Sequence, residues 1–166
     1  MATTALEGNP VNTNGDLPAV GSAAPDFVLV DGDLKDVSLG DFSGKKKLIS
    51  IVPSLDTMVC ATSTRKIDAA AKGRDDLVAI IVSADLPFAM SRFCKEAHTD
   101  TVVTLSMMRG RGFAKDYGVL ITDGPLAGIA ARAVVVIDEN DKVVYTQLVP
   151  EITNEPDYDK ALAATA

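Results

Sequence analysis

The sequence has no apolar run long enough to cross a lipid bilayer. Its longest uninterrupted run, residues 77–82, holds six apolar residues, whereas a membrane-spanning helix needs about 20. The first 20 residues also lack the basic start and the apolar stretch of a secretory signal. These absences favour a cytoplasmic protein that enters no membrane, although a mature chain already stripped of its signal would have the same features.

Positive charge is scarce as well. The chain carries 16 Lys and Arg residues against 23 Asp and Glu residues, a formal net charge of −7. Because phosphates attract Lys and Arg, this balance disfavours nucleic acid as a partner, and it also disfavours docking on an anionic membrane surface. Apolar residues make up 47 % of the 166 residues, which is enough for a core. The length predicts a single domain over residues 1–166.

Motifs that bind nucleotides or metals are missing. The sequence contains neither G-x-G-x-x-G nor the Walker A pattern. Its only histidine, His98, follows Cys94 by four residues, a spacing that can place two metal ligands on one helix face. A stable zinc site needs four ligands, however, and no other Cys and His pair exists. We therefore expect no metal site and no organic cofactor.

The two cysteines, Cys60 and Cys94, are too few for a disulfide framework. In a reducing cytosol, disulfides are usually transient and either catalytic or redox-sensing. The C-x-x-C motif of disulfide oxidoreductases is absent. Cys60 taken alone is equally compatible with a small buried side chain, which is a common fate of free cysteine. Cys94 taken alone, beside Phe93 in a predicted amphipathic helix, favours packing in the core.

Hydrophobic patterning predicts alternating strands and helices. Residues 1–25 are expected to form a β-hairpin extension, and residues 118–130 a Gly- and Pro-rich loop. Lys45, Lys46 and Lys47 are expected in a solvated turn. Strands are predicted over residues 27–30, 37–39, 48–52, 77–82, 102–105, 133–137 and 143–148. Helices are predicted over residues 58–73, 86–97, 112–117 and 156–166. The second of these is expected to be opened by Asp85 and Pro87.

The order β-α-β-α-β, then a hairpin and a closing helix, defines an α/β fold. Strands that are separated by helices imply parallel pairing with both sheet faces covered, whereas the hairpin adds antiparallel strands. The expected architecture is a central mixed sheet flanked by helices. This arrangement resembles the thioredoxin-like fold.

The segment around Cys60 has features that favour a reactive thiolate. Pro53 ends a buried strand, and Asp56 or Thr57 can cap the helix that follows, so Cys60 falls in the first helical turn. Free N–H groups and the positive dipole end of a helix stabilise a thiolate, which is the nucleophilic form of cysteine. Thr57 supplies a hydroxyl three residues before the sulfur, but it is also an ordinary N-cap residue. Arg132 directly precedes a predicted strand, where it can reach a neighbouring site or remain a solvated charge.

Pro53, Thr57 and Cys60 match the peroxiredoxin pattern P-x-x-x-[TS]-x-x-C. Further segments, which together span nearly the whole chain, resemble the bacterial thiol peroxidases, the atypical two-cysteine peroxiredoxins. These segments are residues 8–11, 60–66, 83–89, 91–94, 124–128, 131–140 and 151–158.

The resemblance implies a thiol-dependent peroxidase that reduces hydrogen peroxide and alkyl hydroperoxides. It implies that Cys60 is the peroxidatic cysteine and that Cys94 is the resolving cysteine of an intrachain disulfide. Thr57 would orient the peroxide, Arg132 would stabilise the thiolate, and Pro53 would shield the pocket. The resemblance also implies thioredoxin as the reductant and a homodimer.

One residue departs from the family pattern. Met58 stands where relatives commonly carry Pro or Gly, and it either points into solvent or extends an apolar rim that favours bulky alkyl hydroperoxides. Two functions of other classes use the same residues: a redox-sensing protein whose disulfide switches partner binding, and a structural domain with two inert cysteines.

Overall fold

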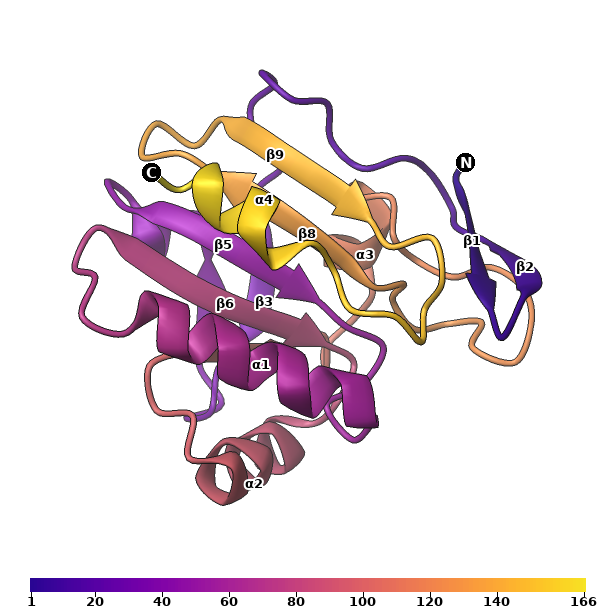
Figure 1. The fold of residues 1–166 in the computed structure, drawn as a ribbon, viewed down its shortest axis with the longest axis horizontal. Coiled ribbons are helices and arrows are strands. Elements are labelled where there is room, and N and C mark those ends of the chain that lie inside the picture. The colour runs from indigo at the N-terminus through magenta and orange to yellow at the C-terminus, as the bar shows by residue number, and fades with distance from the viewer.

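The computed structural model describes residues 1–166, and a mixed seven-stranded sheet forms its centre (Figure 1). The strand order is β4-β3-β7-β6-β5-β8-β9. Strand β6 pairs in parallel with β5 and β7, and every other pairing in this sheet is antiparallel. The strands are β3 (Val28–Val30), β4 (Asp36–Ser38), β5 (Lys46–Ile51), β6 (Leu77–Ser83), β7 (Val103–Ser106), β8 (Ala133–Ile137) and β9 (Val143–Leu148). The predicted mixed sheet is therefore confirmed.

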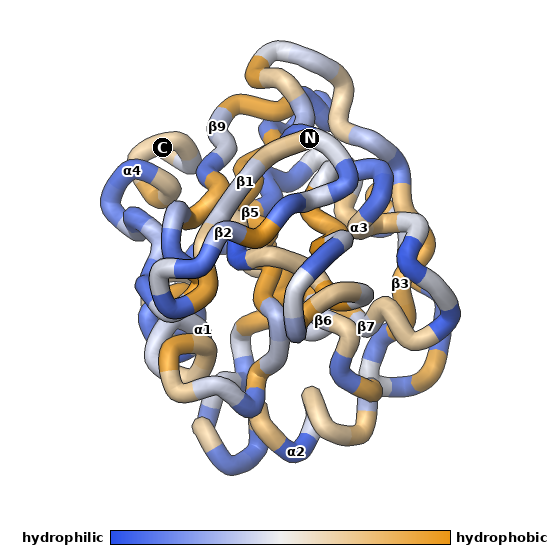
Figure 2. The backbone as a smooth tube through the Cα atoms, turned by 90° about the vertical axis from the view of Figure 1, so that its right-hand side faces the viewer, coloured by the Kyte–Doolittle hydropathy of each residue, from blue (hydrophilic) through white to orange (hydrophobic).

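Helices cover both faces of the sheet, as predicted. They are α1 (Met58–Ala71), α2 (Pro87–Ala97), α3 (Gly112–Asp116) and α4 (Tyr158–Ala163), with a 3-10 turn η1 (Leu39–Phe42) that the sequence did not predict. In β8, Val134 and Val136 share a buried cluster with α1 and α4 residues, whereas Val135 and Ile137 share one with Phe113 of α3. Figure 2 shows the hydrophobic residues concentrated along the central strands. No helix has the length and apolar character that crossing a membrane requires.

The first strands form a separate hairpin, as expected for residues 1–25. Strands β1 (Thr3–Leu6) and β2 (Asn9–Asn12) pair antiparallel around a turn in which Glu7 and Gly8 both have positive φ. The Glu151 carboxylate accepts both turn N–H groups, from Glu7 at 2.9 Å and from Gly8 at 3.0 Å. The hairpin is thus attached to the segment that follows β9.

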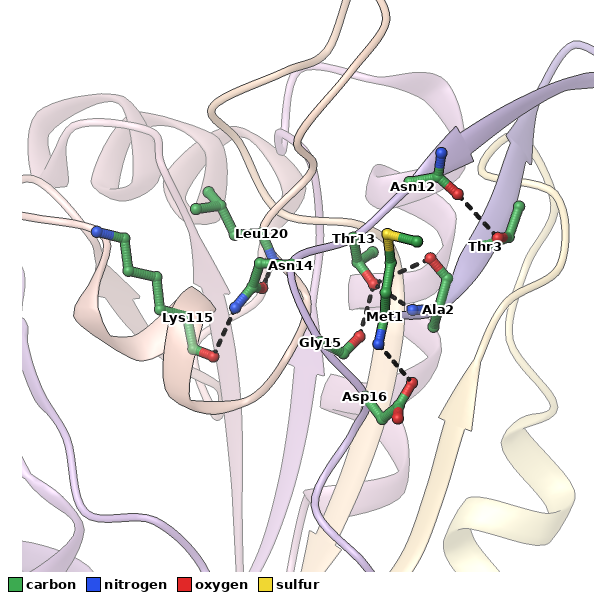
Figure 3. A network of polar contacts seen from close by, with 10 residues as sticks. All are labelled: Met1, Ala2, Thr3, Asn12, Thr13, Asn14, Gly15, Asp16, Lys115 and Leu120. Carbon is green, nitrogen blue, oxygen red and sulfur yellow. Dashed lines mark hydrogen bonds and ion pairs between the residues drawn. The ribbon is translucent and has the colours of Figure 1, made fainter.

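The chain after the hairpin is fixed by the Asn14 side chain, drawn in Figure 3. Its amide donates to the Lys115 carbonyl at 3.0 Å, and its oxygen accepts from the Leu120 N–H at 3.1 Å. The extension is therefore hydrogen-bonded to the segment around α3 as well.

Two details of the sequence prediction are wrong. Lys47 does not lie in a solvated turn, because β5 begins two residues earlier than predicted and pairs Lys47 with Ile137. Its buried ammonium group pairs with the Asp141 carboxylate of the turn between β8 and β9. Asp85 does not cap α2, whose N-cap residue is Leu86. The Asp85 carboxylate instead accepts hydrogen bonds from Ser54, Leu55 and Ser83.

Gly118 provides a test of the packing between the extension and α3. It has φ of +69°, and a Cβ added there would lie 2.0 Å from the Asp16 carbonyl oxygen. We expect Gly118→Ala to lower the free energy of unfolding by about 3 kcal/mol or more, because steric overlap adds to the strain of positive φ.

Gly44→Ala is the matched control, measured by the same urea unfolding experiment. Gly44 also has positive φ, +81°, but nothing lies within 4 Å of an added Cβ. Its expected cost is the backbone strain alone, roughly 1–2 kcal/mol. Equal losses in the two variants would contradict the close approach of Gly118 to Asp16.

Candidate active site

Cys60 lies in the first turn of α1 with its side chain completely buried. Thr57 occupies the N-cap position, as predicted, but its hydroxyl makes no capping hydrogen bond to the helix backbone. The Thr57 Oγ1 atom instead lies 2.7 Å from Cys60 Sγ and 3.1 Å from the Ser54 carbonyl oxygen. Thr57 therefore occupies the N-cap position of α1, while its side chain contacts the Cys60 sulfur rather than the helix backbone.

Arg132 supplies the second polar contact to the sulfur. Its side chain is only 2 % exposed, so the interpretation as a solvated strand-end charge is wrong. The guanidinium donates from Nη1 to Cys60 Sγ at 2.9 Å and from Nε to the Ile152 carbonyl at 2.7 Å. Because guanidinium stays charged and can only donate, it favours the anionic form of the sulfur that accepts from it.

The hydroxyl of Thr57 can satisfy both protonation states of Cys60. A hydroxyl has one proton to donate and two lone pairs to accept with. When Cys60 is a thiol, its S–H can donate to Thr57 Oγ1 while the hydroxyl donates to the Ser54 carbonyl. When Cys60 is a thiolate, the same hydroxyl proton can turn to the sulfur, so neither state leaves the sulfur without a partner.

A cavity of about 400 Å³ opens beside these residues. Thr57, Arg132 and Pro53 are among the residues that line it. Met58 borders the cavity but is 90 % exposed, so most of its surface faces solvent. The remaining lining residues, which sequence reasoning did not identify, are Leu6, Ser54, Val59, Leu126, Ile129, Ile152 and Thr153.

Most of the missed lining residues come from segments far apart in the sequence. Leu6 belongs to the N-terminal hairpin, Leu126 and Ile129 to the loop before β8, and Ile152 to the segment after β9. No short motif joins these segments, so only the folded chain reveals that they meet. Together they give the cavity a mainly apolar wall next to the sulfur.

Cys94 lies outside this group. It sits in the second half of α2 as a partly buried free thiol, and Cys60 is also free. Burial raises the pKa of the Cys94 thiol above its ordinary value. Of the five predicted site residues, four therefore gather around one cavity or its buried sulfur, and Cys94 is held on a separate helix. No cluster of three or more His, Cys, Asp or Glu side chains is arranged to hold a metal ion.

Known proteins resemble this chain over almost its full length. A family model described as Redoxin matches residues 19–162. The thiol peroxidases of Mycobacterium tuberculosis and Mycobacterium bovis are each 53 % identical over 166 residues, which cover 99 % of this chain and 98 % of theirs.

Solved structures agree with these sequence relatives. A peroxiredoxin-like protein from Aquifex aeolicus superposes with a TM-score of 0.93 at 44 % identity, covering 99 % of this chain and 96 % of that one. A thiol peroxidase from Chromobacterium violaceum gives a TM-score of 0.88 at 29 % identity, covering 95 % and 91 %. The predicted thioredoxin-like fold is thereby confirmed. The chain therefore belongs to the redoxin family and, within it, to the thiol peroxidases, which are peroxiredoxin enzymes.

Proposed function

We propose that this chain reduces hydrogen peroxide and alkyl hydroperoxides with Cys60 as the peroxidatic cysteine. The observation that carries the proposal is the buried Cys60 sulfur, which accepts a hydrogen bond from Arg132 and contacts the Thr57 hydroxyl. An inert core cysteine would have apolar neighbours on all sides and would need neither polar partner.

In the first step, the Cys60 thiolate attacks the terminal oxygen of the peroxide. The S–O bond forms as the O–O bond breaks, which gives a sulfenic acid on Cys60 and an alkoxide or hydroxide that takes a proton to become alcohol or water. Negative charge moves from the sulfur to the leaving oxygen. Arg132 and Thr57 are positioned to donate to that developing charge, and such fixed donors lower the barrier. Pro53 shields the reacting atoms from one side.

In the second step, the Cys94 thiol attacks the sulfenic sulfur, which forms an intrachain disulfide and releases water. A disulfide requires Cα atoms within about 7 Å, and we predict that the first turn of α1, part of α2, or both unwind to bring the two cysteines together. Unwinding also exposes Cys94 to solvent, which removes the burial that raises its pKa in the reduced state. Thioredoxin then reduces the disulfide by thiol–disulfide exchange. The cycle needs no metal and no organic cofactor.

The apolar cavity wall supports organic hydroperoxides as substrates. Leu6, Leu126, Ile129 and Ile152 offer a surface that an alkyl group can contact while its peroxide group reaches Arg132. Met58 can add to such a surface only at the rim, because 90 % of it is exposed.

We further propose that residues 1–166 act as one domain, that two copies form a homodimer, and that the protein works in the cytoplasm. Neither nucleic acid nor a membrane surface is included as a partner, because the net charge of −7 disfavours both.

The function is tested by peroxide turnover with thioredoxin, thioredoxin reductase and NADPH. The parent protein should oxidise NADPH when either hydrogen peroxide or cumene hydroperoxide is added. Cys60→Ser should abolish this turnover while its circular dichroism spectrum stays that of the parent, because a serine hydroxyl is not ionised at neutral pH. Turnover in Cys60→Ser near the parent rate would refute the assignment of Cys60.

Arg132 is tested by Arg132→Met, which keeps much of the apolar stem and removes the guanidinium. We expect kcat/KM for hydrogen peroxide to fall by about 100-fold or more, as for the loss of one fixed donor to developing charge. Arg74→Met is the matched control, because Arg74 also donates to a backbone carbonyl, that of Thr165, and it binds the Asp76 carboxylate rather than the Cys60 sulfur. A similar loss in both variants would argue against a specific role for Arg132.

Oxidation is expected to link Cys60 to Cys94 within one chain. The bond closes a loop of about 35 residues, which gives roughly 4 kcal/mol against unfolding in the chain-entropy model, less any strain in the oxidised state. Mass spectrometry of non-reduced peptides after one equivalent of peroxide identifies the linkage. In Cys94→Ser the sulfenic acid should persist and over-oxidise to sulfinic acid. A mainly interchain disulfide would contradict this pairing.

A further inference from the structure

Asp85 lies where three neighbouring strands end. It follows β6 by two residues, and β5 and β7 flank β6 on either side in parallel. The Asp85 N–H donates to Ser83 Oγ at 3.1 Å, and its carbonyl accepts from Ser106 Oγ of β7 at 2.5 Å. The backbone of Asp85 is thus attached to the ends of both β6 and β7.

The carboxylate of Asp85 reaches across to the loop that follows β5. It accepts from Ser54 Oγ at 2.8 Å through Oδ1, and from the Leu55 N–H at 2.8 Å through Oδ2. Ser83 Oγ donates to the same Oδ2 atom at 2.7 Å. Two carboxylate oxygens therefore serve three donors, two of which belong to the loop after β5.

This loop carries Thr57, one of the two polar residues that contact the Cys60 sulfur. Ser54 Oγ accepts from the Asp56 N–H at 3.1 Å, and the Ser54 carbonyl lies 3.1 Å from Thr57 Oγ1. Thr57 Oγ1 in turn lies 2.7 Å from Cys60 Sγ. A series of contacts therefore runs from Asp85 through Ser54 and Thr57 to the sulfur, in which the single Thr57 hydroxyl proton serves either the Ser54 carbonyl or the sulfur at one time.

We propose that Asp85 is a positioning residue that holds the Ser54–Thr57 loop so that the Thr57 hydroxyl stays against Cys60. This inference rests on the proposed role of Cys60 and extends it to a residue that contacts neither sulfur nor cavity. Catalytic efficiency depends steeply on such placement, since small displacements of a reacting group can cost about 100-fold in rate. Asp85 also joins the loop before α1 to the start of α2, the helix that holds Cys94.

An electrostatic role and a positioning role of Asp85 predict opposite effects of its removal on the balance between thiol and thiolate at Cys60. A nearby negative charge disfavours a second one, so an electrostatic role would mean that removing the carboxylate favours the thiolate. A positioning role means that removing it frees Thr57 and disfavours the thiolate. The direction in which the thiolate population changes when the carboxylate is removed therefore distinguishes the positioning role from the electrostatic role.

The side chain of asparagine provides the conservative replacement. Its oxygen can take the place of Oδ2 and accept from Leu55 and Ser83, while its amide donates to the free lone pair of Ser54 Oγ. Asp85→Asn thus removes the charge and keeps the geometry, whereas Asp85→Ala removes both. Asp68→Ala is the matched control, because the Asp68 carboxylate accepts from the Thr101 and Val102 N–H groups at 2.8 and 3.0 Å, outside this loop.

The experiment measures the rate of Cys60 alkylation as a function of pH, with peptide mass spectrometry to identify the alkylated cysteine. Each rate is divided by the rate at the alkaline plateau, so that a difference in the accessibility of Cys60 between variants does not affect the comparison. Asp85→Ala should shift the midpoint upward by about one pH unit, the tenfold change expected from losing one hydrogen bond to a charged group. Asp85→Asn should restore most of the parent profile, and Asp68→Ala should lower the melting temperature without moving the profile.

An unchanged or downward-shifted profile in Asp85→Ala would overturn the positioning role. If Asp85→Ala does not fold, Ser54→Ala removes one link of the series, and it should shift the profile in the same upward direction by a smaller amount. An unchanged profile in a folded Ser54→Ala protein would then count against the inference. Because alkylation needs no peroxide, a parent protein that turns over no peroxide would refute the proposed function without affecting this test.

Discussion

The contact between the Arg132 guanidinium and the Cys60 sulfur is the interaction on which the rest of the site depends. Both side chains are almost completely removed from water, and an unpaired charge in such a place would be strongly unfavourable. A guanidinium cannot lose its charge, so its burial is offset only if acceptors surround it. The Ile152 carbonyl is one acceptor and the sulfur is the other. The sulfur, which accepts from this buried charge, is therefore part of what offsets the burial of Arg132.

Sheet register explains how residues 72 positions apart meet. Strands β5 and β8 pair antiparallel with Ile51 opposite Ala133. Arg132 directly precedes that pair, and the loop that leads to Cys60 directly follows it. The segment after β9 then returns to place the Ile152 carbonyl beside Arg132, and Glu151 attaches the N-terminal hairpin to the same segment. The cavity wall and the charged pair thus depend on one set of strand pairings.

The sequence predicted the elements whose signal is local. Strands β8 and β9 have the predicted bounds because β-branched runs are interrupted by a clear turn. Thr57 is the N-cap residue of α1, as its residue type and its place before the helix indicated. The buried ion pair of Lys47 with Asp141 depends on pairing between distant strands, and so does the apolar cavity wall. Burial of Arg132 depends on the same pairing, and no local pattern indicated it. The family resemblance pointed only to a role for Arg132 at the thiolate.

The most direct test of this account is the ultraviolet absorbance of a thiolate in the reduced protein, taken as the difference between the parent and Cys60→Ser while pH is raised. If Arg132 and Thr57 hold Cys60 as a thiolate, the difference should already be present at neutral pH. The difference should also vanish at neutral pH in Arg132→Met. A difference that develops only in alkaline solution, as for an ordinary buried thiol, would contradict the account.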